Sequence, residues 1–402
     1  MADTPSTSPG QPASAKRSAA SSASGLLPAG LSDLMPEDAR REAEAISMLM
    51  AGFSRFGYVP VQPPLVEFEE TLLAEGPGAA LAAETFRLMD PQTSRMMGLR
   101  ADMTAQIARI ACTRMGHMPR PLRLSYHGAV LRVRPDPLNP ERQLMQVGAE
   151  MIGAASPDND AELAVAALTA LRHAGSERMT IDLGIPRLLE AVISDVTDDL
   201  AHAVAAKDPV QVRALAGADA DILCRLMDMP MAGLDGLADA IGGLGKDLPD
   251  TARHMLEDLL HVGQLIRGAA DFAQVTIDPL ETRGFDYHHG IGFAIFAPGV
   301  RGELGRGGRY RTSAIGGDAE ESTGVTLYLE RVLRAIPTLV PDTRLYVPHS
   351  AGLAVLRRQV DDGVNAVFGA AAAGTVAAME EEARSLGCTH ILEDGVSRPL
   401  GD

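Results

Sequence analysis

Two long strand-like runs in the middle of the chain constrain the fold more than any other feature of the sequence. They cover residues 122–133 and 143–152, and the loop between them contains Pro135, Pro137 and Pro140. A proline cannot donate a ladder hydrogen bond, so it rarely stands inside a paired strand. We therefore predict two neighbouring strands with a hairpin-like return.

Shorter elements of both kinds surround these two runs. Apolar spacing predicts helices at 36–53, 103–115, 158–173 and 328–335, the third capped by Asp158 or Asn159, and strands at 58–61, 86–90, 96–100, 179–183, 293–296 and 323–327. The connections are hairpin-like and do not follow a regular βαβ alternation. This order favours an α+β fold in which helices pack against an antiparallel sheet.

The composition of the chain changes at three places. Residues 1–25 are mostly Ser, Ala and Pro, so we expect a disordered tail; the alternative, a targeting peptide, fits less well because the segment has no apolar stretch and a single Arg. Residues 185–273 have helical periods broken by turns such as Gly233, which indicates a helical insertion in a core of 26–335. Residues 336–402 predict a small α/β module, with strands at 345–347 and 389–392 and two Ala-rich helices.

Charge and cysteine content exclude several classes of protein. The formal net charge is −17, which argues against a protein whose main task is binding nucleic acid, because phosphate contacts need clustered Lys and Arg. No apolar run reaches the ~18–20 residues that a membrane-spanning helix needs. Cys112, Cys224 and Cys388 fit no metal or redox spacing. We expect a cytoplasmic protein that does not bind membranes.

Polar side chains gather on the predicted strands. Arg100, Asp102 and Thr104 would share one face if their segment stays extended. Gln146 and Glu150 also share a face, and Gly148 between them would leave room for a ligand. Asp102, Gln146 and Glu150 together would suit an ammonium group and a polar side chain, if their strands are neighbours; a solvated sheet face is the alternative.

Two further segments suggest metal or phosphate binding, and we reject both. His288 and His289 are adjacent, so on a strand they point to opposite faces and one at most faces a site. We therefore expect no metal site. The Gly-rich run 305–308 lacks the Gly-Lys-Ser/Thr ending of a phosphate-binding loop.

These segments, in this order, resemble the catalytic core of the class II histidyl-tRNA synthetases over about 26–335. Residues 56–67 are similar to motif 1, with Pro64 as its proline, and Leu131-Arg132 to the core of motif 2. Residues 283–287 are similar to the histidine-specific Arg-Gly-Leu-Asp-Tyr-Tyr signature, and 329–331 to the end of motif 3. The resemblance implies the class II antiparallel sheet flanked by helices, with the insertion between motifs 2 and 3.

The departures from the synthetase pattern fall on the nucleotide side. The motif 2 glutamate that helps to hold adenine is Arg134 here, and the phenylalanine that stacks on adenine is Leu144. A motif 3 glycine, which lets ATP lie close, is replaced by Tyr328, while the motif 3 Arg331 is kept. A tyrosine added to a close-fitted pocket costs stability or binding through overlap. The resemblance therefore implies a degenerate ATP pocket that does not activate amino acids.

The amino-acid side of the site is better kept. The resemblance places eight residues where the synthetases contact histidine: Asp102, Thr104, Arg132, Gln146, Glu150, Arg283, Tyr287 and His288. Asp102 replaces a glutamate and His288 replaces the second tyrosine of the signature. A carboxylate such as Glu150 could still accept the α-ammonium or an imidazole proton through a charge-assisted hydrogen bond.

The short C-terminal module and the Asp102–Gln106 variant point to one branch of this superfamily, the regulatory subunits of ATP phosphoribosyltransferase. That resemblance implies a protein without catalysis or cofactors of its own. It implies a homodimer through the core, a hetero-octamer with the short catalytic subunit in the first step of histidine biosynthesis, and L-histidine as the feedback effector. Two alternatives stay open: an active histidyl-tRNA synthetase-like ligase that lacks a full anticodon domain, and a binding protein with another partner.

Overall fold

The computed structural model describes residues 26–401 apart from 75, 136–139, 283, 285–286, 313–317, 338–342 and 371–374. The predicted tail, 1–25, lies outside the described residues. The chain divides after Pro337 into a large unit and a small C-terminal unit.

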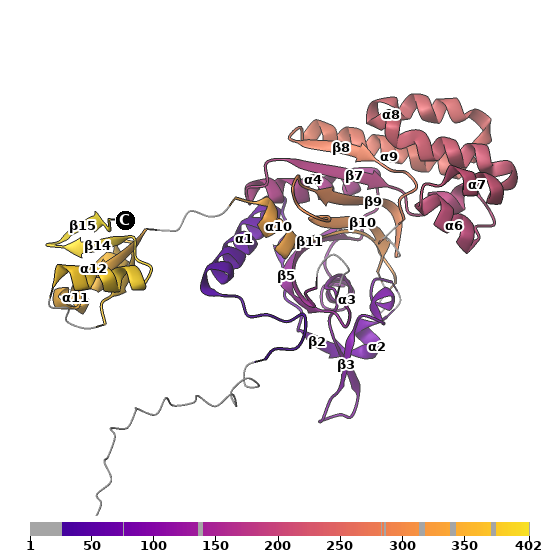
Figure 1. Cartoon of the computed structure of the whole chain (residues 1–402). Helices are drawn as coiled ribbons and strands as arrows, with labels where there is room; N and C mark the ends of the chain where they lie inside the picture. Colours follow the sequence, from indigo (N-terminus) through magenta and orange to yellow (C-terminus); the bar gives the residue numbers. More distant parts are fainter. Residues whose placement is uncertain are drawn as a thin grey trace, which may run out of the picture. The chain divides into compact units, whose positions relative to one another are not determined.

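An eight-stranded sheet forms the centre of the large unit (Figure 1). Its order is β1 (Val59–Pro60), β5 (Leu122–Leu131), β6 (Gln143–Ile152), β11 (Glu321–Tyr328), β10 (Gly305–Arg311), β9 (His288–Phe296), β7 (Met179–Gly184) and β8 (Ala273–Ile277). Only the two edge pairs, β1–β5 and β7–β8, are parallel. The predicted return between the two long strands is confirmed, because β5 and β6 pair antiparallel along their whole length.

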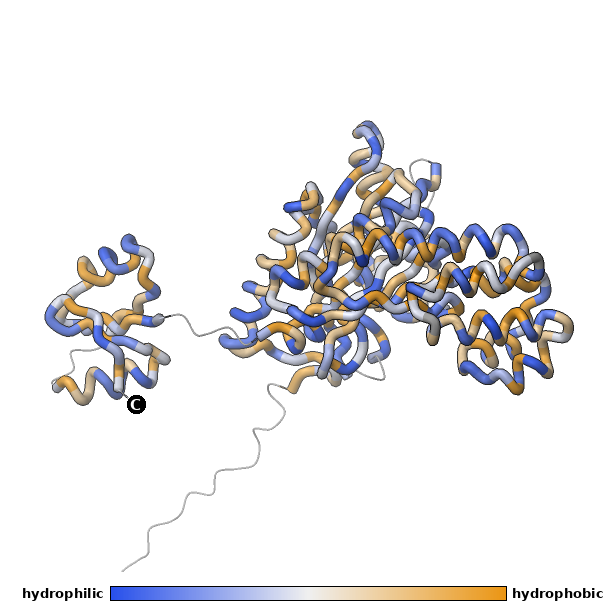
Figure 2. The backbone as a smooth tube through the Cα atoms, turned by 90° about the horizontal axis from the view of Figure 1, so that it is seen from above, coloured by the Kyte–Doolittle hydropathy of each residue, from blue (hydrophilic) through white to orange (hydrophobic). Residues whose placement is uncertain are grey.

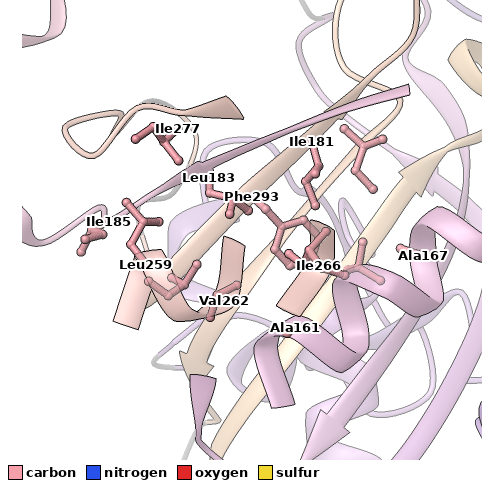
Figure 3. Packing of buried hydrophobic residues seen from close by; sticks show 14 of the residues in the cluster. Ala161, Ala167, Ile181, Leu183, Ile185, Leu259, Val262, Ile266, Ile277 and Phe293 are labelled. Carbon is pink, nitrogen blue, oxygen red and sulfur yellow. The ribbon is translucent and has the colours of Figure 1, made fainter. Parts of the chain in front are cut away.

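Helices cover one face of this sheet and bury the odd-numbered residues of β6, such as Val147 and Met151. The helices are α1 (Pro36–Ser54), α4 (Pro157–His173), α9 (Asp250–Ala269) and α10 (Leu329–Ala335). Figure 3 shows Ala161 and Ala167 of α4 beside side chains of α9 and β7. Small residues allow close contact here: a Cβ on Gly52 of α1 would lie 2.6 Å from Cα of Ala170.

The opposite face of the sheet carries even-numbered residues of β6 and is only partly covered. Helix α3 (Thr104–Thr113) packs Ile107 and Ala111 against apolar residues of β5 and β6, and Met103, directly before the helix, joins them. Beside it lies a small sheet of β2 (Val66–Phe68), β4 (Met96–Leu99) and β3 (Phe86–Met89), together with α2 (Glu69–Leu72) and a 3₁₀ turn at Ala79–Leu81. The cavity described below opens on this face.

The helical insertion contains α5 (Leu188–Val192), α6 (Asp198–Ala205), α7 (Pro209–Leu215) and α8 (Ala220–Leu244) before α9. Thr197 and Asp208 cap α6 and α7 through their side chains. Hydrophilic and hydrophobic residues alternate along these helices (Figure 2), as expected where one stripe is buried. The predicted turn at Gly233 is confirmed, because its positive φ of 62° interrupts α8.

The C-terminal unit is a four-stranded sheet with a helix on each face. Its order is β13 (Asn365–Phe368), β12 (Arg344–Val347), β14 (His390–Glu393) and β15 (Val396–Pro399), with helices α11 (Leu353–Asp361) and α12 (Val376–Ser385) and a 3₁₀ turn at His349–Ala351. The two predicted strands and two predicted helices are present. Strands β13 and β15 were not predicted from the sequence.

Two local predictions are wrong. The segment 99–106 does not stay extended, because β4 ends at Leu99 and α3 begins at Thr104. Helix α4 is capped by Ser156 rather than by Asp158 or Asn159; its hydroxyl accepts the Asn159 amide at 3.2 Å. In the described ranges, no helix is both long and apolar enough to cross a membrane.

Candidate functional site

A cavity of ≈ 470 Å³ opens on the polar face of the large sheet. Its walls come from β9, β10 and β11, from the start of α3, from the end of β5 and from the turn near Leu81. Nine residues predicted from the sequence line it: Asp102, Thr104, Arg132, Arg134, Leu144, Tyr287, His288, Tyr328 and Arg331. The sheet thus brings together residues that lie more than 200 positions apart in the chain.

Asp102 is the carboxylate on the inner wall of the cavity. Its Oδ1 accepts the backbone amide of Thr104 at 2.8 Å, and its Oδ2 accepts the amide of Gln146 at 2.7 Å. Gln146 in turn accepts the backbone amide of Met103 at 3.1 Å. Because these bonds fix the carboxylate, Gln146 acts behind the wall as a residue that positions Asp102.

Glu150 lies behind the same wall and is fully buried. Its carboxyl group accepts hydrogen bonds from Tyr310 at 2.9 Å and Tyr126 at 3.3 Å. Burial raises the pKa of Glu150 to about 8, although the Tyr310 hydrogen bond opposes the shift; the nearby Asp102 raises it further. Within the described residues, neither Glu150 nor Asp102 has a basic nitrogen within 4.0 Å. Among the residues that the structure describes, the inner end therefore holds two carboxyl groups and no basic side chain paired with them.

Aromatic side chains form the rest of the inner end. Tyr287 stacks on His288 with ring centroids 4.2 Å apart, and it meets Tyr310 edge to face at 5.8 Å. Burial lowers the pKa of His288 to about 3, so its imidazole is neutral. As predicted, only one histidine of the pair faces the site: the ring of His289 contacts Glu321 at 2.7 Å.

Arginines dominate the outer end. Arg306 and Arg331 both form ion pairs with Glu303. Tyr328 also lines the cavity, with the Arg331 guanidinium 5.1 Å from its ring centroid. Burial raises the pKa of Tyr328 to about 12, so its hydroxyl stays protonated.

Glycines on this face make room for side chains of the protein itself, which corrects one prediction. The space over Gly148 is not left for a ligand, because a Cβ there would overlap the ring of Tyr126. A Cβ on Gly324 would likewise overlap the carboxyl group of Glu150. In the Gly-rich run, a Cβ on Gly308 would lie 2.7 Å from Cδ2 of His288. These glycines serve packing within the sheet.

Several predicted residues lie elsewhere. Gln146 and Glu150 stand behind the cavity wall rather than on it, and Arg283 lies outside the described residues. Arg100 does not join Asp102 and Thr104, because its guanidinium turns away to the carbonyl groups of Ala129 and Pro63.

The sequence did not single out Tyr310, Arg306, Glu303 or Thr326 as site residues, although all four line the cavity. The sequence pattern could have identified two of them. Arg306 and Tyr310 are both even-numbered residues of β10, and alternation along a strand places such residues on one face. In the part of the chain that the structure describes, no group of three His, Cys, Asp or Glu residues could hold a metal ion.

Comparison with known proteins agrees with this geometry. A family model described as histidyl-tRNA synthetase matches residues 30–332. A structure from Bacillus halodurans titled ATP phosphoribosyltransferase regulatory subunit/histidyl-tRNA synthetase has a TM-score of 0.74 at 22% identity and covers 89% of this chain and 96% of its own. A Nostoc histidyl-tRNA synthetase has a TM-score of 0.73 at 16% identity and covers 92% and 91%. The fold and the site thus define a class II, histidyl-tRNA synthetase-like protein.

Curated relatives identify one family within this class. The ATP phosphoribosyltransferase regulatory subunits of Rhodospirillum centenum and Paramagnetospirillum magneticum are 46% and 43% identical to this chain. The alignments cover 94% and 92% of the chain and 97% of each relative. The chain belongs to the ATP phosphoribosyltransferase regulatory subunit family, which confirms the resemblance found in its sequence.

Proposed function

We propose that this chain is the non-catalytic regulatory partner of an ATP phosphoribosyltransferase catalytic subunit and that its cavity binds L-histidine as the feedback effector. The observation that carries the proposal is the charge distribution of the cavity. Two oppositely charged residues line the cavity. Within the described residues, the fixed carboxylate of Asp102 has no cationic partner, and Arg132, whose Nε donates to the carbonyl of Ala101 at 3.4 Å, has no carboxylate partner. A zwitterionic amino acid complements both charges.

The proposed binding mode follows from the walls. Asp102 and Thr104 take the cationic or imidazole part of histidine, and Arg132 takes its carboxylate. Tyr287 and the neutral His288 give the flat surface on which the imidazole packs. Gln146 and Glu150 act through the wall residues that they hold, and we assign Arg283 to the same site from the sequence resemblance alone.

Tyr328 supports the proposal that the cavity binds histidine without activating it with ATP. It takes the register position opposite Gln146 on the neighbouring strand, so its ring covers the sheet face where the resemblance places ATP. Leu144 and Arg134 remove the stacking ring and the glutamate from the same region. Arg132 and Arg331, which both line the cavity, are the observations in favour of the alternative function, an active histidyl-tRNA synthetase-like ligase.

The proposed assembly is a hetero-octamer with the short catalytic subunit in the first step of histidine biosynthesis, in the cytoplasm. It contains a homodimer of the core, 26–335, and we assign the edge strand β1 to that interface. Val59 of β1 is 51% exposed, and a surface groove between α1 and β1 is lined by Ile46, Met50 and Val61 among others. Apolar side chains beside an unpaired strand edge favour association. We assign no role to the module 336–402.

Feedback requires that histidine bind one state of the assembly better than another, since a ligand with equal affinity for both states does not change their populations.

The first test is to mix the purified chain with the short catalytic subunit. The rate of phosphoribosyl transfer to ATP should rise, a larger complex should form, and histidine should inhibit it. No change in rate or mass would refute the regulatory role.

The second test locates the effector. Asp102→Asn should weaken histidine binding about tenfold to a hundredfold, which corresponds to the loss of a charge-assisted hydrogen bond of about 1.5–3 kcal/mol. Glu162→Gln is the matched control, because that carboxylate pairs with Arg123 at 2.8 Å on β5 and does not line the cavity. Unchanged histidine binding and inhibition in Asp102→Asn would place the effector elsewhere.

A further inference from the structure

We infer that Arg306 is a positioning residue, which clamps the chain at Gly284 and so holds the aromatic wall that Tyr287 forms in the cavity. Each nitrogen of its guanidinium donates to an oxygen of the protein. Nε and Nη2 donate to the Glu303 carboxylate at 2.8 and 2.7 Å, and Nη1 donates to the Gly284 carbonyl at 2.6 Å. A guanidinium engaged in this way supports the wall rather than a ligand. The inference rests on the proposed function, since it concerns the same site.

Gly284 has the two properties that this contact needs. Its φ of 77° lies in the left-handed region, and a Cβ added there would overlap Nη1 of Arg306. Glycine meets both conditions because it has no side chain. The guanidinium of Arg306 therefore lies directly against the backbone of a segment 22 positions away in the chain.

Strand β10 supports the wall at a second point, through Tyr310. Arg306 and Tyr310 are both even-numbered residues of β10, and both line the cavity. The ring of Tyr310 meets Tyr287 edge to face at 5.8 Å, and Tyr287 stacks on His288. One strand thus holds the chain at Gly284 through a guanidinium and at Tyr287 through a packed ring.

Glu303 fixes the orientation of Arg306, because its carboxylate accepts two hydrogen bonds from the same guanidinium. The backbone carbonyl of Glu303 also accepts Nη1 of Arg331 at 3.2 Å, which joins the clamp to the start of α10. A lysine at position 306 would keep the positive charge. Its single ammonium group lacks the planar fork that reaches two carboxylate oxygens and a carbonyl at once.

The test therefore compares Arg306→Lys with a matched control in the full chain. The control is Arg120→Lys, because Arg120 makes the same set of contacts away from the cavity walls: Nε and Nη2 donate to Glu320 at 2.6 and 2.7 Å, and Nη1 donates to the Met115 carbonyl at 3.1 Å. In isothermal titration calorimetry, Arg306→Lys should weaken L-histidine binding about tenfold, which corresponds to about one hydrogen bond. Arg120→Lys should leave it within about twofold.

Histidinol separates positioning from direct contact, because it keeps the imidazole and the amine of histidine and lacks the carboxylate. Arg306→Lys should weaken the binding of both compounds by the same factor, since both pack their ring on Tyr287. A loss confined to histidine would show that Arg306 binds the carboxylate itself, and it would overturn the positioning role. Equal losses in Arg306→Lys and Arg120→Lys would also overturn it, because they would reflect general destabilisation.

Hydrogen–deuterium exchange tests the clamp without any ligand. In Arg306→Lys, the peptide that contains Gly284 and Tyr287 should exchange about tenfold faster than in the unmodified chain, because the chain opens locally more easily without the clamp. The same peptide should keep its rate in Arg120→Lys. An unchanged rate in Arg306→Lys would overturn the inference. The two proposals fail separately: absence of histidine binding to the unmodified chain refutes the proposed function, and exchange still decides the clamp.

Discussion

The hydroxyl of Tyr310 on β10 donates a 2.9 Å hydrogen bond to Oε2 of Glu150 on β6, across the intervening strand β11. Glu150 can take this position because its register partner on β11 is Gly324, where an added Cβ would overlap the Glu150 carboxyl group. It holds a carboxyl group in the interior with its pKa raised to about 8. Near neutral pH, Glu150 therefore holds a proton beside the wall residue Asp102.

Histidine binding should release this proton in part. A cation bound at Asp102 favours the ionised form of Glu150 and lowers its pKa. At pH 7, calorimetry in buffers of different ionisation enthalpy should show proton release on histidine binding, and Glu150→Gln should release less. Equal proton release in the two proteins would contradict a link between Glu150 and the ligand.

The stability of the free protein should depend on pH through the same group. Between the ordinary value of 4.5 and about 8, Glu150 holds a proton in the folded chain and has lost it in the unfolded chain. Its stabilising contribution is complete below pH 4.5 and is lost as pH rises through 8, at up to about 1.4 kcal/mol per pH unit. Urea denaturation from pH 5 to 8 should therefore show the unmodified chain losing stability relative to Glu150→Gln. Parallel curves would contradict the raised pKa.

The chain should not catalyse histidine-dependent exchange of pyrophosphate into ATP. Tyr328 covers the sheet face, and Arg134 and Leu144 replace two further contacts to adenine. Tyr328→Gly alone should therefore leave exchange at background, because it restores space without restoring those contacts. A histidyl-tRNA synthetase assayed in parallel is the positive control, and comparable turnover by this chain would support the ligase alternative.

Gly148→Ala should destabilise the fold by about 2–3 kcal/mol, since a methyl group there overlaps the fully buried ring of Tyr126 and the Val325 carbonyl oxygen. Gly268→Ala is the matched control: it lies in α9 with no atom within 4 Å of an added Cβ, so helix propensity should make it neutral or stabilising by up to about 1 kcal/mol. The measurement is the free energy of unfolding in urea. A tolerated Gly148→Ala would show that Tyr126 moves easily and that the space is open to a ligand.

Much of the fold could be predicted because local patterns agree with the tertiary structure. Runs 122–133 and 143–152 gave β5 and β6 almost to the residue, and the positive φ at Gly233 marks a turn that only glycine adopts easily. Strand β13 was missed because its four residues are partly exposed and carry little pattern. The cap of α4 was misplaced by two or three residues, because the choice among neighbouring polar side chains depends on backbone geometry.

The sequence by itself identified several chemical groups of the site, among them Asp102, Arg132, Glu150 and Tyr328, because the motifs around them stand in an order shared with one family. Only the tertiary structure decided how they are arranged. It placed Asp102 on the cavity wall and Glu150 behind it, and it filled the space over Gly148 with Tyr126. The physical reason is that alternation along a strand assigns a residue to a face, while depth and accessibility depend on side chains from neighbouring strands.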